Sequence, residues 1–150
     1  MIRHARNEDV PAIRQFLTNQ EEHGIIPRPL AYLYDHLRDY QIYGGNLGPR
    51  ILGVAALHIC WEGTAEIRSL IVRSSHRRKG IGRALVGECL AEAGLLGMRE
   101  VFLLTLIPEY FQRFGFRVVT REELPPVAWA DCVHCVKFPG CNETPMLLAL

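Results

Sequence analysis

A basic, glycine-containing turn between a strand and a helix constrains this chain more than any other feature. The turn is Arg77-Arg78-Lys79-Gly80-Ile81-Gly82, with a predicted strand at residues 66–72 before it and a predicted amphipathic helix at residues 83–93 after it. Unpaired backbone N–H groups and the positive end of the helix dipole meet at such a turn. Glycines there let a ligand approach the main chain closely. The sequence therefore predicts an anion site at the start of this helix.

The charge distribution indicates a compact anionic ligand. The 150 residues carry a net charge of +1, which is ordinary for one globular domain spanning residues 1–150 and gives no reason to expect nucleic acid as a partner. The basic residues gather instead at positions 73–83 of a neutral body. We therefore expect this turn to bind a pyrophosphate. The residues expected to contribute are Arg77, Arg78, Lys79, Gly80, Ile81, Gly82 and Arg83.

Cysteine usage and hydropathy predict a cytoplasmic protein. No apolar run approaches the ~18 residues of a membrane span, and the N-terminal residues lack a secretory signal pattern. The chain has 5 cysteines, an odd number. Because Cys60 and Cys89 fall in predicted core elements, we expect reduced thiols. No membrane partner is expected.

Apolar periodicity and turn residues predict a chain in which strands and helices alternate. Strands are expected at residues 2–6, 40–43, 50–61, 65–72, 101–106 and 116–119, and helices at residues 7–20, 30–38, 80–96 and 109–114. The second helix is expected to turn Leu30, Leu33, Tyr34 and Leu37 inward. The dipeptide Glu62-Gly63 predicts a hairpin between the third and fourth strands. The last 30 residues are expected to be irregular, with a final strand at residues 146–149.

This order of elements resembles the GNAT family of acetyl-CoA-dependent N-acetyltransferases. Arg77, Gly80 and Gly82 match the family signature Gln/Arg-x-x-Gly-x-Gly/Ala, and residues 111–116 (Phe-Gln-Arg-Phe-Gly-Phe) look like its aromatic-x-x-x-Gly-Phe segment. The resemblance covers residues 1 to about 124. It implies a mixed α/β (α+β) fold, in which helices flank a mostly antiparallel central sheet and the fourth and fifth strands splay apart. It also implies acetyl-CoA as cosubstrate, and it admits a homodimer.

Four segments are similar to the acetyltransferase domain of N-acetylglutamate synthases. They are residues 25–28 (Ile-Ile-Pro-Arg), 65–67, 102–105 and 111–116. The resemblance implies that Arg28 binds the substrate carboxylate. A second substrate-binding arginine of the bacterial synthases is replaced here by Ile107. Arg68, expected near the same cleft, is the candidate to take its place.

Acetyl transfer to an amine needs a group that removes a proton, because an ammonium is mostly protonated at pH 7. Glu66 is the first candidate for this base, since it begins the strand that runs beside the acetyl group in the family. The alternative for Glu66 is a solvent-facing strand residue. His58, on the neighbouring strand, is the second candidate base, because its ordinary pKa suits proton transfer near pH 7.

The oxyanion and the leaving thiolate need their own partners. The resemblance implies that main-chain N–H groups near Leu70, Ile71 and Val72 stabilise the oxyanion and that the thioester arm lies between the parted strands. Many family members protonate the thiolate with a tyrosine, whose position falls on Phe111 here. Tyr110 is therefore the candidate acid. It lies one residue before that position, however, and on a helix it is expected to point elsewhere.

The tail at about residues 125–150 contains the cysteine cluster Cys132, Cys135 and Cys141. The Cys-x-x-Cys spacing suits structural zinc, but three thiolates leave one ligand of a tetrahedron unassigned. A loop with reduced thiols is the favoured alternative, so we predict no metal.

Together these features predict an acetyltransferase that acts on the amine of a small amino acid. Glutamate is the favoured acceptor, which implies a role in arginine biosynthesis. Two alternatives remain at this point. One is acetylation of a protein lysine, an N-terminus or another amine, and the other is a non-catalytic module that only binds acetyl-CoA.

Overall fold

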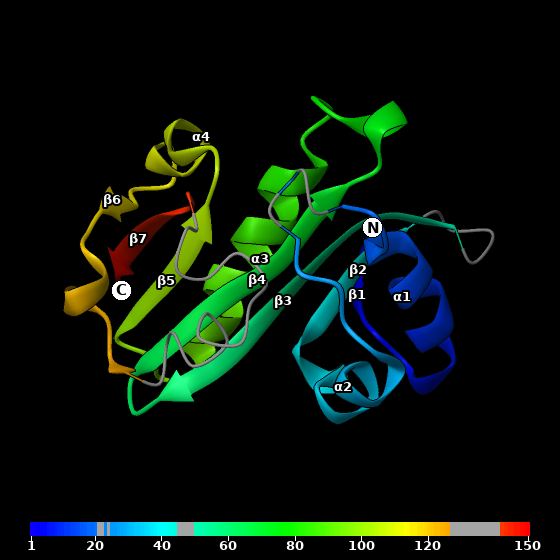
Figure 1. The fold of residues 1–150 in the computed structure, drawn as a ribbon, viewed down its shortest axis with the longest axis horizontal. Coiled ribbons are helices and arrows are strands. Elements are labelled where there is room, and N and C mark those ends of the chain that lie inside the picture. Colours follow the sequence, from blue (N-terminus) through cyan, green and yellow to red (C-terminus); the bar gives the residue numbers. More distant parts are fainter. Residues whose placement is uncertain (21–22, 24, 45–49, 127–141) are drawn as a thin grey trace.

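The computed structural model describes residues 1–20, 23, 25–44, 50–126 and 142–150. Within these residues the strands form one 7-stranded sheet, in the order β1-β2-β3-β4-β5-β7-β6 (Figure 1). The strands are β1 (Ile2–His4), β2 (Tyr40–Gly44), β3 (Ile51–Trp61), β4 (Thr64–Val72), β5 (Glu100–Thr105), β6 (Arg117–Val118) and β7 (Thr144–Ala149). The α-helices are α1 (Val10–Leu17), α2 (Leu30–Asp35), α3 (Ile81–Leu95) and α4 (Pro108–Gln112). No helix of the described residues is both long and apolar enough to cross a membrane.

The two faces of the sheet bury different helices (Figure 1). Alternate residues of β3 explain why, because successive strand side chains point to opposite faces. Ala55 and Leu57 join a core with α3, whose Leu85 is fully buried. Val54 and Ala56 join a second core with α1 and α2. The predicted mixed fold with a central sheet between helices is therefore confirmed.

Strands β4 and β5 run parallel but pair only at their first residues. The ladder joins Thr64, Ala65 and Glu66 of β4 to residues 100–102 of β5 and ends there. Every other neighbouring pair of strands in the described part of the sheet is antiparallel. The predicted parting of the fourth and fifth strands is thus confirmed, and it opens the sheet beside the C-terminal half of β4.

A bulge in β4 changes which face its side chains occupy. Val54 pairs with Ile71 and Ala56 with Arg68, so two residues of β4 lie opposite one residue of β3. Ser69, one of the two, has a left-handed φ of 54°. Ile67 packs in the core with α3, whereas Ile71 packs in the core with α1 and α2. An unbroken strand would place both on one face, so the bulge reverses the alternation.

Several predicted bounds are wrong in detail. The first helix ends at Leu17 and not at residue 20, because Thr18 is extended and Asn19 has a left-handed φ of 62°. The second helix ends at Asp35, and a separate 3-10 turn follows at Leu37–Asp39. Its expected inward face is only partly correct: Leu33 is buried, but Leu30 and Tyr34 are 39% and 46% exposed.

Candidate active site

The turn before α3 has the backbone of an anion cradle. Arg78 and Gly80 both adopt left-handed conformations, with φ of 62° and 84°. Gly80 is the residue before the first turn of α3, and a Cβ added to it would meet nothing within 4 Å. Alternating left-handed residues and a helix N-terminus both turn N–H groups toward one concavity. The turn is therefore open at Gly80, and its binding of a pyrophosphate stays a prediction.

The side chains of the cradle differ in their roles. Arg77 is held by its Nε, which donates to the carbonyl oxygen of Val72 at 3.2 Å. Arg77, Arg78 and Arg83 line the main cavity, whereas the exposed Lys79 is not among its lining residues. Partial burial and the surrounding cations lower the pKa of His76, so positive charge on this imidazole is disfavoured. The cradle thus offers permanent positive charge from guanidinium groups.

A cavity of about 1080 Å³ runs from the cradle along the parted strands. Predicted site residues from distant parts of the sequence line it together. They are Arg28, Glu66, Arg68, Leu70, Ile71, Val72, Arg77, Arg78, Gly80, Ile81, Gly82, Arg83 and Tyr110. Ligand sites of small molecules have comparable volumes. Most of the predicted site residues therefore surround one cavity.

Glu66 and Arg68 form an ion pair in the wall of this cavity. Arg68 Nε donates to Glu66 Oε1 at 2.6 Å, and the two side chains are only 12% and 10% exposed. The alternative for Glu66, a solvent-facing strand residue, is wrong, since Glu66 is buried. Such a short charge-assisted bond fixes both side chains in orientation. Glu66 also lies 4.0 Å from the Cys60 thiol.

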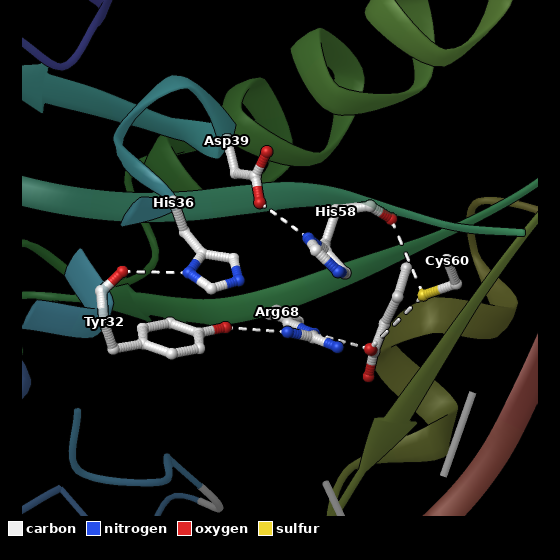
Figure 2. Close-up of polar contacts among 7 residues, drawn as sticks. Tyr32, His36, Asp39, His58, Cys60 and Arg68 are labelled. Carbon is white, nitrogen blue, oxygen red and sulfur yellow. Dashed lines mark hydrogen bonds and ion pairs between the residues drawn. The ribbon is translucent and has the colours of Figure 1, made fainter. Parts of the chain in front are cut away.

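Tyr32 links the two arginines that the sequence assigns to substrate. Its hydroxyl accepts a hydrogen bond from Arg68 Nη1 at 2.7 Å (Figure 2). The guanidinium carbon of Arg28 lies 4.2 Å from the centroid of its ring. Arg28 comes from the segment before α2, and Arg68 comes from β4. The packing of α2 on the sheet therefore brings them together.

His58 is turned toward a carboxylate outside the cavity. It lies directly opposite Glu66 in the β3–β4 ladder, so both residues start from the same face. Its Nδ1 is 2.8 Å from Asp39 Oδ2, and it is not among the residues that line the cavity (Figure 2). This geometry favours Glu66 over His58 as the group that meets an incoming amine.

Tyr110 lines the cavity, and the expectation that it points elsewhere is wrong. Its hydroxyl oxygen would lie 2.8 Å from a Cβ added to Gly82, so the absence of a side chain there lets the phenol approach the first turn of α3. Phe111, the position assigned by spacing, is buried against the core with α3. Burial raises the pKa of Tyr110, which keeps its proton available for donation.

The bulge of β4 carries the residues assigned to the oxyanion. Leu70, Ile71 and Val72 line the cavity beyond the last β4–β5 pair. Ser69, at the bulge, is hydrogen-bonded to Tyr40, and burial raises the pKa of that phenol to about 12. The Tyr40–Ser69 contact holds the bulge from the side of α1 and α2. Neither this bulge nor its tyrosine could be seen in the sequence pattern.

The cysteines give no metal site within the described residues. No group of three His, Cys, Asp or Glu side chains there could hold an ion. Cys132, Cys135 and Cys141 lie outside the described residues. Cys60 and Cys89 are free thiols, as predicted, and burial raises the pKa of Cys89 to about 12.

Comparison with known proteins agrees with this geometry. Residues 8–116 match the Acetyltransferase (GNAT) family. An uncharacterized N-acetyltransferase of Chlorobaculum tepidum is 35% identical over 150 residues, which cover 99% of this chain and 96% of that protein. An amino-acid acetyltransferase of Mycobacterium tuberculosis is 34% identical over 128 residues, covering 85% of this chain and 72% of that protein.

The same fold occurs within a longer chain of known structure. The N-acetylglutamate synthase of Neisseria gonorrhoeae, complexed with coenzyme A and N-acetyl-glutamate, superposes with a TM-score of 0.87 and 26% identity. The match covers 100% of this chain and 35% of that one. With its family match, its relatives and a cradle and cavity of the required form, this chain belongs to the GNAT family and is an acetyl-CoA-dependent N-acetyltransferase.

Proposed function

We propose that this enzyme acetylates the α-amine of a small amino acid, with glutamate as the favoured acceptor, and so serves arginine biosynthesis. One observation carries the proposal: Arg28, Arg68 and Glu66 line the same cavity as the cradle. A guanidinium pairs well with a carboxylate, and two of them suit an acidic amino acid better than a cationic amine. The relatives named amino-acid acetyltransferase support the same substrate class.

In the proposed reaction each residue has one task. Acetyl-CoA supplies an activated acetyl thioester, and the cradle residues bind its phosphates. Glu66 accepts the proton of the substrate ammonium through its carboxylate. The main-chain N–H groups of residues 70–72 stabilise negative charge as it develops on the acetyl oxygen. Tyr110 donates its phenolic proton toward the departing sulfur.

Arg28 is the residue that separates an acidic acceptor from other amines. The experiment measures thiol release from acetyl-CoA with glutamate, glutamine, aspartate, lysine, spermidine and a short peptide as acceptors. We expect glutamate to give the highest kcat/KM. Substitution of Arg28→Gln should raise the KM for glutamate by about 10- to 100-fold, because a hydrogen bond to a charged group contributes about 1.5–3 kcal/mol.

The matched control is Arg38→Gln, which removes an exposed arginine outside the cavity. It should leave the KM for glutamate and the KM for acetyl-CoA unchanged. If the peptide or spermidine gives the highest kcat/KM and Arg28→Gln does not affect it, the amino-acid assignment is wrong and acetylation of another amine takes its place.

A further inference from the structure

We propose that Tyr32 is a positioning residue that joins Arg28 and Arg68 into one carboxylate-binding unit. This inference rests on the function proposed above, because the unit acts only if the acceptor carries a carboxylate. Tyr32 itself need not touch the substrate. It determines the orientation of the two guanidinium groups that do.

The first contact is at the hydroxyl of Tyr32. Arg68 Nη1 donates to this oxygen at 2.7 Å, while Arg68 Nε donates to Glu66 at 2.6 Å (Figure 2). Because a guanidinium is planar, two bonds at different nitrogens fix the direction of the whole group. Tyr32 and Glu66 therefore determine which edge of Arg68 is presented to the cavity.

The second contact is at the ring of Tyr32. The Arg28 guanidinium lies over this ring at 4.2 Å from the centroid. The imidazole of His36 stacks on the same ring, with centroids 3.9 Å apart and an interplanar angle of 15°. Two groups this close to one centroid must occupy opposite faces. Arg28 is thus held by a cation–π contact with a phenol that His36 supports from behind.

The support of the ring continues to the sheet. His36 Nδ1 lies 2.9 Å from the carbonyl oxygen of Tyr32, one helical turn earlier. The His58 ring lies 5.2 Å from that of His36 and is itself held by Asp39 (Figure 2). The ring of Tyr32 is therefore held between His36 and Arg28, which limits its rotamers.

The advantage of this arrangement is preorganisation. A free arginine side chain loses rotamer entropy when it binds a ligand, and that loss weakens binding. Arg28 and Arg68 come from segments far apart in the sequence, and Tyr32 contacts both of them. Orienting both before the substrate arrives lowers the KM for the acceptor. It does not alter the cradle, so the KM for acetyl-CoA should be independent of Tyr32.

Two substitutions separate the contacts of Tyr32. Tyr32→Phe keeps the ring for Arg28 and His36 but removes the hydroxyl that Arg68 uses. It should raise the KM for glutamate about 10-fold, the effect of one charged hydrogen bond. Tyr32→Leu removes both contacts and should raise this KM by about a further 5-fold, the effect of a cation–π contact. The matched control is Tyr34→Phe, on the exposed face of the same helix.

A double-mutant cycle distinguishes positioning from a structural effect. In an Arg68→Ala background, Tyr32→Phe should change the KM for glutamate by less than about 2-fold, because the hydroxyl acts through Arg68. The KM for acetyl-CoA should stay within about 2-fold in every variant. If Tyr32→Phe lowers activity equally with and without Arg68, or changes both KM values alike, the positioning role is overturned.

The same assays keep this inference apart from the proposed function. If the wild-type enzyme acetylates glutamate and Tyr32→Phe leaves its KM unchanged, the inference is wrong and the proposed function stands. If the wild type prefers another amino acid, glutamate is wrong, and the Tyr32 variants are measured with that acceptor, whose carboxylate the same unit should hold. If no acceptor with a carboxylate is acetylated, both proposals are wrong.

Discussion

Replacing Gly53 with alanine should loosen the contact between α3 and the sheet at the point where the cradle begins. A Cβ added to Gly53 would lie 2.9 Å from Ile81 Cγ2, 3.0 Å from Leu85 Cδ1 and 3.4 Å from the carbonyl oxygen of Ile71. Ordinary contacts between such carbons are about 3.5–4.0 Å, so the helix or the strand must move by roughly half an ångström or more.

The stiffness of the Ile81 side chain determines how much stability Gly53→Ala loses. Its Cγ2 is bonded directly to Cβ, and a β-branched side chain in a helix has one strongly preferred rotamer. Ile81 therefore cannot swing away as the end of a leucine can, and its backbone must shift. Overpacking of this kind costs about 1–3 kcal/mol, from which the lower entropy of the unfolded alanine chain subtracts about 0.4–1 kcal/mol. The expected net loss for Gly53→Ala is about 1–2 kcal/mol.

The assay is thermal unfolding combined with steady-state kinetics. For a chain of this size the loss corresponds to a decrease in Tm of about 2–8 °C. Because Ile81 is the first residue of α3, its displacement also moves the cradle, and the KM for acetyl-CoA should rise. The control is Gly87→Ala in the same helix, where a Cβ meets nothing within 4 Å. It should gain about 0.5–1 kcal/mol through helix propensity and leave the KM unchanged.

Two results would refute this reasoning. If Gly53→Ala unfolds at the wild-type temperature, the contacts to Ile81 and Leu85 do not limit the spacing of α3 and the sheet. If it is less stable but binds acetyl-CoA normally, the first turn of α3 does not carry the cradle.

Three further predictions concern the cradle, the base and a buried phenol. Gly82→Trp should fill the cavity and abolish coenzyme A binding in calorimetry, whereas Gly87→Trp, exposed on the same helix, should bind normally. Glu66→Gln should lower kcat by about 10²–10⁴-fold at pH 7 and by less as pH rises toward the pKa of the substrate amine, because a neutral amine needs no base; an unchanged pH profile would remove Glu66 from this role. Burial raises the pKa of Tyr40 to about 12. Since the unfolded phenol ionises near pH 10, the stability contributed by Tyr40 should be lost as pH rises from 10 to 12, by up to about 1.4 kcal/mol per pH unit. Urea unfolding of Tyr40→Phe should show a smaller loss over this range.

The cradle could be predicted from sequence because its chemistry is local. Its sequence signal is a glycine at the N-terminus of a helix, with arginines and a strand before it. The N–H groups of such a turn belong to one short segment of main chain and need no distant partner. The hairpin of β3 and β4 is equally local, since Gly63 at its turn has a left-handed φ of 76°. The hairpin is confirmed, whereas the binding of a pyrophosphate at the cradle stays a prediction.

The acceptor side of the site depends on contacts that no local pattern encodes. Tyr32 meets Arg68 across 36 residues of sequence, and the stack with His36 becomes important only once α2 lies on the sheet. Tyr110 shows the same limit at shorter range. Counting back from Gly115 assigned the position of the acid to Phe111. Both rings line the cavity, but the direction of α4 relative to Gly82 brings the hydroxyl of Tyr110 to the first turn of α3. Such directions follow from tertiary packing.

The bulge at Ser69 explains how one strand serves both halves of the reaction. Before the bulge, Glu66 and Arg68 lie on the face covered by α1 and α2, because Ala65 and Ile67 occupy the face of α3. After it, Leu70 and Val72 pack with α3, the helix whose first turn forms the cradle. Acceptor groups and cradle therefore belong to opposite faces of the sheet. They can meet only where the sheet is open, and the β4–β5 ladder ends at Glu66, on the N-terminal side of the bulge. In the proposed reaction, the splayed strands are thus the passage that brings an amine on one face to a thioester held from the other.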